Sequence, residues 1–154
     1  MYTIQSYTTK HKRDVKELGY DSFEEKSIFL DALTKADSQS LVLLHNKTII
    51  GFALISFGKY ANGLPKGTEI AYIALSEDYQ GQGLGSMMIK YIQKQFSGPI
   101  WLQVAYSNPD AQRLYKRCGF QIWRRIGTKM DGGFLMGYKE TPWAGRLRAT
   151  NGQN

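Results

Sequence analysis

The sequence is poor in the residues that build covalent or metal cross-links. It has one cysteine, Cys118, among 154 residues, which excludes an internal disulfide and a metal site of several thiolates. Its two histidines, His11 and His45, are too few for a zinc centre, so we expect no metal. No stretch approaches the about 18 consecutive apolar residues of a membrane-spanning helix, and no apolar signal segment opens the sequence. We expect a cytoplasmic protein without a membrane partner.

The residues that are present suit one domain of enzyme size. Hydrophobic residues make up 42% of the chain, enough for a sizeable core at this length. The last stretch, residues 141–154, is polar apart from Trp143 and contains Pro142 and two glycines. That composition is typical of a loose tail. We therefore predict a domain at residues 1–140 and a C-terminal tail at 141–154.

Periodicity and turn residues predict alternating strands and helices. Helices are expected at 10–18, between Thr9 and Gly19, and after a capping box at Ser22-Phe23-Glu24-Glu25. A hairpin is expected about residues 45–47, and loops at 61–67 and 131–133. The expected strands lie at residues 2–7, 41–44, 48–57, 69–75, 100–106, 121–126 and 134–139.

The most informative stretch is a glycine-rich turn between a strand and a helix. Gln80-Gly81-Gln82-Gly83-Leu84-Gly85 follows the apolar strand 69–75 and runs into a helix. The first turn of a helix leaves backbone N–H groups unpaired at the positive end of its dipole, and glycines let a bulky anion approach. The turn predicts a phosphate or pyrophosphate site. The residues expected on one face of the helix are Met87, Met88, Tyr91 and Ile92.

Two familiar phosphate loops do not fit this spacing. The dinucleotide motif G-x-G-x-x-G needs its third glycine one residue later than Gly85, and a P-loop needs a lysine that Gly85-Ser86-Met87 lacks. Taken alone, the turn also fits a glycine-rich connection without a ligand.

A second motif follows the strand at 100–106. Asn108 is a good N-cap and Pro109 suits the first helical position. Gly119 ends the helix and Phe120 starts a new apolar run. The segment reads Asn-Pro-x-Ala-x-x-Leu-Tyr-x-x-x-Gly-Phe. Its apolar face is expected to consist of Ala111, Leu114, Tyr115 and Cys118.

Together the two motifs resemble those of the GNAT superfamily of N-acetyltransferases. Gln-x-x-Gly-x-Gly is similar to the pyrophosphate loop that binds coenzyme A, and the later segment is similar to the second motif of that superfamily. The specific resemblance covers roughly residues 69–120. It implies an α/β fold with a mixed, twisted sheet of about seven strands and about four helices, in the order βααβββαβαββ.

The resemblance also implies a binding site for the co-substrate acetyl-CoA. Strand backbone groups would pair with the pantetheine amides, and the glycine loop would hold the pyrophosphate. Tyr115 would donate a proton to the departing thiolate, although an aromatic residue on an inner helix face is also typical of core packing. The coenzyme-binding residues so implied are Ile73, Ala74, Leu75, Gln80, Gly81, Gln82, Gly83, Leu84, Gly85, Ser86, Asn108 and Tyr115.

The general base has two candidate positions. Related ribosomal-protein N-terminal acetyltransferases carry glutamate where this chain has Gln103, which cannot take a proton. Histone-type lysine acetyltransferases have glutamate at the start of the earlier strand, where Glu69 stands. Glu69 shares a strand face with Ala71 and Ile73, and Tyr72 on the opposite face is expected in the core. Glu69 as a base, directly or through water, and Glu69 as a solvated charge both stay open.

Positive charge is concentrated in the last third of the chain. Residues 1–110 hold 11 basic and 11 acidic side chains, whereas residues 111–154 hold 9 basic and 2 acidic ones. The whole net charge of +7 lies there, where it would attract the phosphates of coenzyme A. No basic motif interleaved with aromatic residues is present, which argues against a nucleic-acid partner.

These observations predict an enzyme that transfers the acetyl group of acetyl-CoA to a primary amine by direct attack in a ternary complex. The acceptor stays open between a small-molecule amine, a peptide N-terminus and a protein lysine. The oligomeric state also stays open, a homodimer included. The alternatives are a coenzyme-binding regulator without transfer activity and, less favoured, a basic nucleic-acid-binding module.

Overall fold

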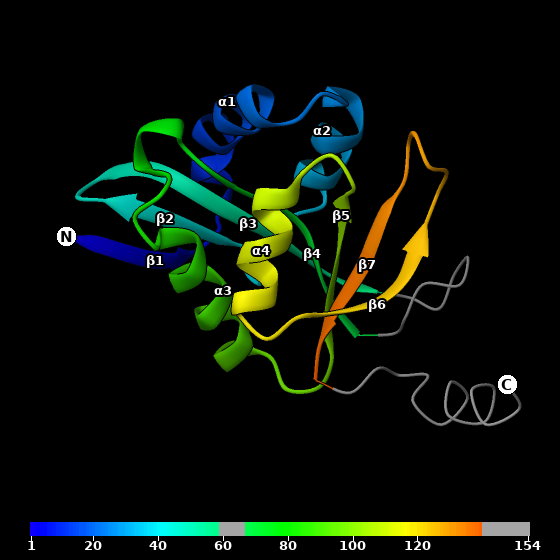
Figure 1. The fold of residues 1–154 in the computed structure, drawn as a ribbon. Coiled ribbons are helices and arrows are strands. Elements are labelled where there is room, and N and C mark those ends of the chain that lie inside the picture. Colours follow the sequence, from blue (N-terminus) through cyan, green and yellow to red (C-terminus); the bar gives the residue numbers. More distant parts are fainter. Residues whose placement is uncertain (59–66, 140–154) are drawn as a thin grey trace, which may run out of the picture. The chain divides into compact units, whose positions relative to one another are not determined.

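The computed structural model describes residues 1–58 and 67–139. Its elements follow the expected order βααβββαβαββ, with two short 3-10 turns, η1 (Thr9–His11) and η2 (Glu77–Tyr79), added (Figure 1). The predicted tail, and the predicted loop apart from Gly67, lie outside the described residues. The strands are β1 (Tyr2–Ser6), β2 (Leu41–His45), β3 (Thr48–Gly58), β4 (Gly67–Leu75), β5 (Ile100–Ala105), β6 (Gln121–Ile126) and β7 (Gly133–Tyr138). The helices are α1 (Lys12–Ser22), α2 (Lys26–Thr34), α3 (Leu84–Gln95) and α4 (Pro109–Arg117).

All seven strands belong to one mixed sheet in the order β1-β2-β3-β4-β5-β7-β6. The pairs β1–β2, β2–β3, β5–β7 and β7–β6 are antiparallel. A parallel pair joins β4 to β5, where Glu69 lies opposite Trp101. The mixed sheet of seven strands and the four helices confirm the fold class expected from the sequence.

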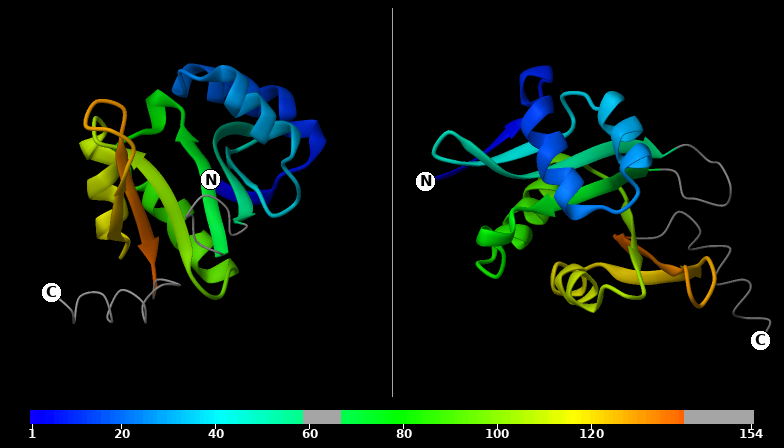
Figure 2. Two further views of the ribbon diagram at one scale, coloured as in Figure 1. Left: turned by 90° about the vertical axis from the view of Figure 1, so that its right-hand side faces the viewer. Right: turned by 90° about the horizontal axis from the view of Figure 1, so that it is seen from above.

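The chain divides into two compact units. The first unit comprises Met1–Ser56 with Ile70–Ile92, and the second comprises Phe57–Glu69 with Gln93–Asn154. Strands β3 and β4 and helix α3 each contribute to both units. Within the first unit, α1 and α2 cover one face of the strands and α3 covers the other (Figure 2).

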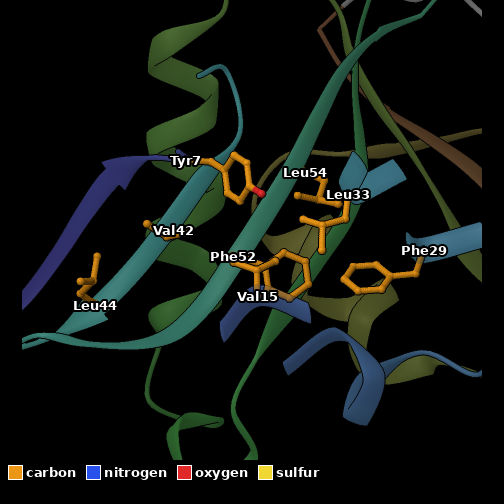
Figure 3. Packing of buried hydrophobic residues seen from close by; sticks show 8 residues of the cluster. All are labelled: Tyr7, Val15, Phe29, Leu33, Val42, Leu44, Phe52 and Leu54. Carbon is orange, nitrogen blue, oxygen red and sulfur yellow. The ribbon is translucent and has the colours of Figure 1, made fainter. Parts of the chain in front are cut away.

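The first unit has a core between its strands and the helix pair α1–α2. Tyr72 packs against this core, with its ring edge-on to Phe23 and Phe29 at centroid distances of 4.8 and 5.2 Å. Its expected place in the core is therefore confirmed. The buried cluster consists of Tyr7, Val15, Phe29, Leu33, Val42, Leu44, Phe52 and Leu54 (Figure 3).

Helix α1 continues beyond the end expected from the sequence. Gly19 was expected to stop it, but the helix runs through Gly19 to Ser22. A Cβ on Gly19 would clash with the ring of Phe29, which is fully buried against that point. This glycine therefore serves close helix packing rather than helix termination.

The expected capping box at residues 22–25 is also wrong. The Ser22 hydroxyl donates to the Leu18 carbonyl at 2.9 Å inside α1, and Glu25 is the N-cap of α2 without a side-chain cap bond. Because α1 extends to Ser22, that side chain is not available to α2. A reciprocal capping box is instead present at η1, where the Thr8 N–H donates to His11 Nδ1 at 3.0 Å.

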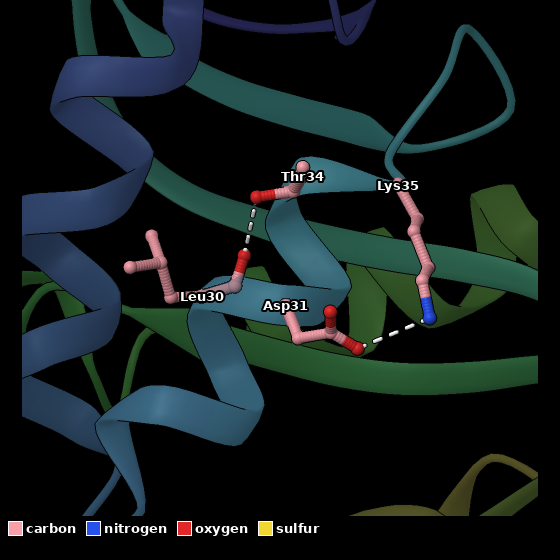
Figure 4. Close-up of polar contacts among 4 residues, drawn as sticks. All are labelled: Leu30, Asp31, Thr34 and Lys35. Carbon is pink, nitrogen blue, oxygen red and sulfur yellow. Dashed lines mark hydrogen bonds and ion pairs between the residues drawn. The ribbon is translucent and has the colours of Figure 1, made fainter.

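Helix α2 ends with local polar contacts (Figure 4). The Thr34 hydroxyl donates to the Leu30 carbonyl at 2.9 Å, and Lys35 pairs with Asp31 at 3.1 Å. Both charged side chains are mostly exposed, so the ion pair contributes only about 0.3–0.5 kcal/mol. The position of α2 therefore depends on its buried residues Phe29 and Leu33.

Helix α3 buries a face that differs from the expected one. Met87 and Tyr91 are only half-buried, whereas Leu84 and Ile89 are buried with Met88 and Ile92. Residues 84, 88 and 92 recur every four positions, which aligns them along one side of the helix. Burial thus begins at Leu84, the first helical residue, and fixes the start of α3 directly after the glycine loop.

The second unit contains β5, β7 and β6 with helix α4. Its β6–β7 connection was expected to turn at residues 131–133, and Gly133 instead begins β7. A Cβ on Gly133 would clash with the carbonyl oxygen of Val104 on β5, and a Cβ on Gly132 would clash with that of Thr128. Glycine at position 133 lets β7 pack directly on the backbone of β5, and glycine at position 132 lets the β6–β7 connection close on its own backbone.

Candidate functional site

The structure distributes the predicted site residues between the two units. The first unit contains Ile73, Ala74 and Leu75 at the end of β4 together with the loop at residues 80–86. The second unit contains Glu69, Asn108 and Tyr115. The roles of these residues stay predictions.

The glycine loop has the backbone that an anion site requires. Gly81 and Gly83 have φ values of +78° and +82°, in the left-handed region that residues with a Cβ avoid. A Cβ added at either position would meet no atom within 4 Å, so packing inside the protein does not require glycine there. The space over both residues is therefore open.

Helix α3 begins immediately after this loop. The Met87 N–H donates to the Gly83 carbonyl at 3.1 Å, which is the first helical bond. The first turn contains no acidic residue, so the positive end of the helix dipole is not opposed there. Backbone N–H groups at this end are suited to a phosphate group.

The end of β4 is half-buried at Ile73, Ala74 and Leu75. The Leu75 carbonyl accepts a hydrogen bond at 3.1 Å from the side chain of Gln80. A carbonyl oxygen has a second lone pair, so it keeps acceptor capacity. Gln80 thus ties the entry of the glycine loop back to the strand that precedes it.

Helix α4 begins as the sequence predicts. The Asn108 side chain accepts from the Ala111 N–H at 3.2 Å and Pro109 occupies the first turn. Gln112 donates to the Ala105 carbonyl at 2.9 Å, which holds the helix start against the end of β5. Gly119, at φ +91°, follows the end of the helix.

Tyr115 is the buried residue of α4, with 8% of its surface exposed. Its ring lies 6.0 Å from that of Phe120. Burial, and then the nearby Cys118, raises the pKa of Tyr115 to about 12. The phenol is therefore protonated at neutral pH and acts as a hydrogen-bond donor.

The Tyr115 hydroxyl makes no hydrogen bond to the residues that the structure describes. Among those residues, the only fully buried side-chain polar atom without a partner is Nε1 of Trp101. A buried phenol that keeps its proton at neutral pH is suited to donate a hydrogen bond to a bound molecule.

Glu69 is half-buried near the start of β4. Its partner in the parallel ladder is Trp101, and Gln103 follows Trp101 by two residues on the same face of β5. The parallel ladder of β4 and β5 ends at the pair Glu69–Trp101, so Gln103 lies beyond the paired part of the two strands.

A hollow of about 330 Å³ lies beside the end of β5 in the second unit. Asp131, which lies in this hollow, is one of two acidic residues in the basic stretch 111–154. An acidic residue within a basic stretch is the one signal of this hollow in the sequence, because the loop that contains Asp131 has no recognisable motif. The residues that line the hollow are Gln103, Val104, Ala105, Ile126, Gly127, Asp131, Gly132 and Gly133.

Basic side chains surround α4 on its exposed side. Lys116 and Arg117 are exposed, and Arg113 forms an ion pair with Asp110. Arg125 on β6 lies over the ring of Phe134 at 5.9 Å. Because Asp110 compensates Arg113, the local positive potential depends more on Lys116 and Arg117.

Residues 1–58 and 67–139 contain no cluster of three or more His, Cys, Asp or Glu side chains able to hold a metal ion. In the same part of the chain, every helix is too short or too polar to cross a membrane.

The fold is similar to those of several solved structures. Naa50 from Arabidopsis thaliana, in complex with the bisubstrate analogue CoA-Ac-MVNAL, matches with a TM-score of 0.72 and 18% identity, over 90% of this chain and 99% of that one. The ribosomal-protein-S18-alanine N-acetyltransferase from Escherichia coli matches with a TM-score of 0.67 and 22% identity, over 90% of this chain and 93% of that one. Ard1 from Thermoplasma volcanium matches with a TM-score of 0.71 and 21% identity, over 91% of this chain and 97% of that one. At these identities the likeness shows the fold.

The sequence itself identifies the family. No curated protein matches the chain, but the family model described as "Acetyltransferase (GNAT) family" matches residues 4–120. That match contains the glycine loop and the helix of Tyr115, the two segments on which the resemblance was based. This chain belongs to the GNAT acetyltransferase family.

Proposed function

We propose that the protein is an N-acetyltransferase that transfers the acetyl group of acetyl-CoA to a primary amine in a ternary complex. The observation that carries this proposal is the loop at Gly81 and Gly83. Both residues have left-handed backbone, open space and the start of α3 beside them, in a chain of the acetyltransferase family.

The first unit has the task of binding the coenzyme. N–H groups of residues 81–86 would hold the pyrophosphate, and the backbone of Ile73, Ala74 and Leu75 would pair with the pantetheine amides. Bound there, acetyl-CoA supplies an acetyl group already activated as a thioester. No nucleophile from the protein is then required, which agrees with the buried position of Cys118.

Tyr115 has the task of stabilising the leaving sulfur. With a pKa of about 12, complete proton transfer to a thiolate of pKa near 8.5 would cost about 5 kcal/mol. We therefore assign Tyr115 a strong hydrogen bond to the sulfur as negative charge develops on it, followed by protonation from solvent. Asn108 supports this residue indirectly, because it caps the helix that carries Tyr115.

The acceptor amine needs a proton acceptor and a place to bind. A primary amine of pKa about 10 is mostly protonated at neutral pH and must lose a proton before it attacks the thioester. We assign this role to Glu69, directly or through water, since Gln103 cannot accept a proton. The hollow beside β5 would receive the acceptor, with the Asp131 carboxylate near its ammonium group.

An acetyl-transfer assay with a matched pair of variants tests the proposal. Purified protein is incubated with acetyl-CoA and a panel of peptide N-termini, lysine peptides and small amines, and thiol release is measured together with acceptor mass. We expect acetylation of at least one class, lost in Gly83→Val. The control is Gly98→Val, because Gly98 has a similar φ of +81° and equally open space but lies outside the coenzyme loop.

Each remaining outcome supports one of the alternatives. Saturable acetyl-CoA binding without transfer to any acceptor would indicate a coenzyme-binding regulator. Absence of acetyl-CoA binding, together with salt-sensitive retention of RNA or DNA, would indicate a nucleic-acid-binding module.

A further inference from the structure

An aromatic cluster ties the N-terminal strand of the first unit to the coenzyme loop. The ring of Tyr2 stacks on that of His45 with centroids 4.8 Å apart and an angle of 29°. The Tyr79 ring lies edge-on to both, at 6.4 Å from Tyr2 and 5.4 Å from His45. His45 Nδ1 and the Tyr79 hydroxyl form a hydrogen bond of 2.8 Å. Three segments distant in sequence thus meet at one point.

Strand pairing brings the first two rings together. Tyr2 and His45 are direct partners in the antiparallel ladder of β1 and β2, where side chains of a pair lie on the same face. Beyond this pair, the Met1 carbonyl accepts from the Asn46 N–H at 3.0 Å, and the N-terminal ammonium group donates to the Asn46 side chain at 3.3 Å. The stack therefore sits at a sheet corner that is fixed by backbone and side-chain bonds.

Tyr79 connects this sheet corner to the glycine loop. It ends η2 and directly precedes Gln80, and its N–H donates to the Ser76 carbonyl at 2.9 Å. Further along, the Gln82 side chain donates to the Asp78 carbonyl at 3.4 Å and accepts from the Tyr2 hydroxyl, also at 3.4 Å. The cluster thus contacts the loop at its entry and at its middle residue.

The loop needs such support because its glycines have little around them. Gly81 and Gly83 meet no atom where a Cβ would stand, and glycine loses more conformational freedom on ordering than any other residue. A loop that is ordered before the coenzyme arrives loses less entropy on binding and binds more tightly.

We propose that Tyr2, His45 and Tyr79 are positioning residues that order the coenzyme loop before acetyl-CoA binds. The inference rests on the proposed function of that loop, since none of the three residues needs to touch the coenzyme. The N-terminal strand then sets the affinity for acetyl-CoA without taking part in the chemistry.

Two tyrosine variants test this role. Tyr79→Phe keeps the ring and removes the hydroxyl that bonds to His45, and Tyr2→Phe removes the contact with Gln82 while keeping the stack. We expect Tyr79→Phe to raise Kd and KM for acetyl-CoA about 5–10-fold with kcat at saturation unchanged, and Tyr2→Phe to raise them about 2-fold. The control is Tyr20→Phe, since the Tyr20 ring packs on the Phe29 core, away from the loop; it should change neither constant.

Amide hydrogen exchange of residues 80–86 in the free protein supplies a readout that does not depend on activity. We expect exchange in this loop to accelerate about 10-fold in Tyr79→Phe and in His45→Leu. His45→Asn, which keeps a hydrogen-bonding group near the Nδ1 position, should recover part of the protection. The Tyr20→Phe control should exchange as the wild type does.

The outcomes separate this inference from the proposed function. Unchanged loop exchange and unchanged Kd in Tyr79→Phe, with only a lower melting temperature, would overturn the positioning role and leave simple packing. If Tyr79→Phe does not fold, Tyr2→Phe and His45→Asn decide by the same two measurements. If the wild type does not bind acetyl-CoA, the proposed function fails, while the exchange data still decide whether the cluster orders the loop.

Discussion

Two glycine-containing turns of this chain look alike in sequence and differ in what surrounds them. Around Gly81 and Gly83 a Cβ would meet nothing within 4 Å, whereas at Gly132 and Gly133 it would clash with neighbouring backbone. The first turn has a left-handed backbone and open space, which the coenzyme would occupy in the proposed function. The second needs glycine because the backbone is crowded there: Gly133 lies against β5, and Gly132 lies against the carbonyl groups of its own hairpin connection. Under the proposed function, substitution of the open turn should affect binding, whereas substitution of the crowded turn should affect folding.

The largest expected effect is on stability, at the crowded turn. Gly133→Ala places a methyl group against the Val104 carbonyl of β5, so the backbone must shift. We expect a loss of about 3 kcal/mol in the free energy of unfolding, or about 6–12 °C in Tm. Urea and thermal unfolding measure it. A loss below about 1 kcal/mol would mean that the hairpin backbone shifts at little cost, and that this turn does not require glycine for folding.

Tyr115 gives the next largest effect, on catalysis. Tyr115→Phe keeps the buried ring and removes the hydroxyl that donates to the leaving sulfur. We expect kcat to fall about 100-fold or more with little change in the Kd for acetyl-CoA. Steady-state kinetics and calorimetry measure the two quantities. Unchanged turnover, where chemistry limits the rate, would assign Tyr115 to packing alone.

The Tyr115→Phe variant should also differ from the wild type in how its stability depends on pH in the alkaline range. The pKa of Tyr115 is about 12 in the folded protein and about 10 in the unfolded chain. As pH rises above 10 the unfolded chain loses this proton first, so the stabilising contribution, complete below pH 10, disappears by pH 12. The wild type should lose up to about 3 kcal/mol more than Tyr115→Phe across this window. Equal losses would mean that the tyrosine is more solvated than the fold indicates.

At the open turn the expected effect is on binding. Gly83→Val should weaken acetyl-CoA binding about 30-fold, or about 2 kcal/mol, because a side chain would occupy the space for the pyrophosphate. Its backbone strain should cost about 1–2 kcal/mol of stability. Gly98→Val carries the same strain and should leave the Kd unchanged. Calorimetry measures both variants, and equal losses of affinity would show that strain, not ligand access, is responsible.

Several of these features could be predicted from the sequence because they depend on local chemistry. The cap at Asn108 and the hairpin about residues 45–47 follow from residue types and short spacing. The helix end predicted at Gly19 was wrong, because glycine is needed there to make room for the Phe29 ring from another helix. The hollow near Asp131 and the cluster of Tyr2, His45 and Tyr79 could not be predicted either, because they too form between segments that are distant in sequence. Contacts between distant segments leave no spacing in the sequence to read.

A smaller effect is expected at Glu69. If its carboxylate assists deprotonation of the amine, Glu69→Gln should lower kcat/KM about 10-fold at low pH, where more of the acceptor is protonated, and less at high pH. A pH–rate profile of both proteins measures this. A mutant profile parallel to that of the wild type would mean that the proton leaves through water or through a residue that binds the acceptor.

The smallest effect concerns charge around α4. The KM for acetyl-CoA should rise a few-fold with salt as the Debye length shortens from ~30 to ~8 Å. Charge reversal at Arg113 and Arg117 should remove most of that dependence with kcat intact, and Arg117 should contribute more because Arg113 is paired with Asp110. Kinetics at several salt concentrations measure it, and a salt-independent KM would remove any steering role for this basic surface.

The most direct test of the central claim is a calorimetric titration of the wild-type protein with acetyl-CoA and, separately, with NAD. Both ligands carry a pyrophosphate, so the comparison asks whether this particular loop recognises coenzyme A. The account predicts that acetyl-CoA binds at least about 10-fold more tightly, a difference of about 1.4 kcal/mol. Tighter binding of NAD than of acetyl-CoA would contradict it.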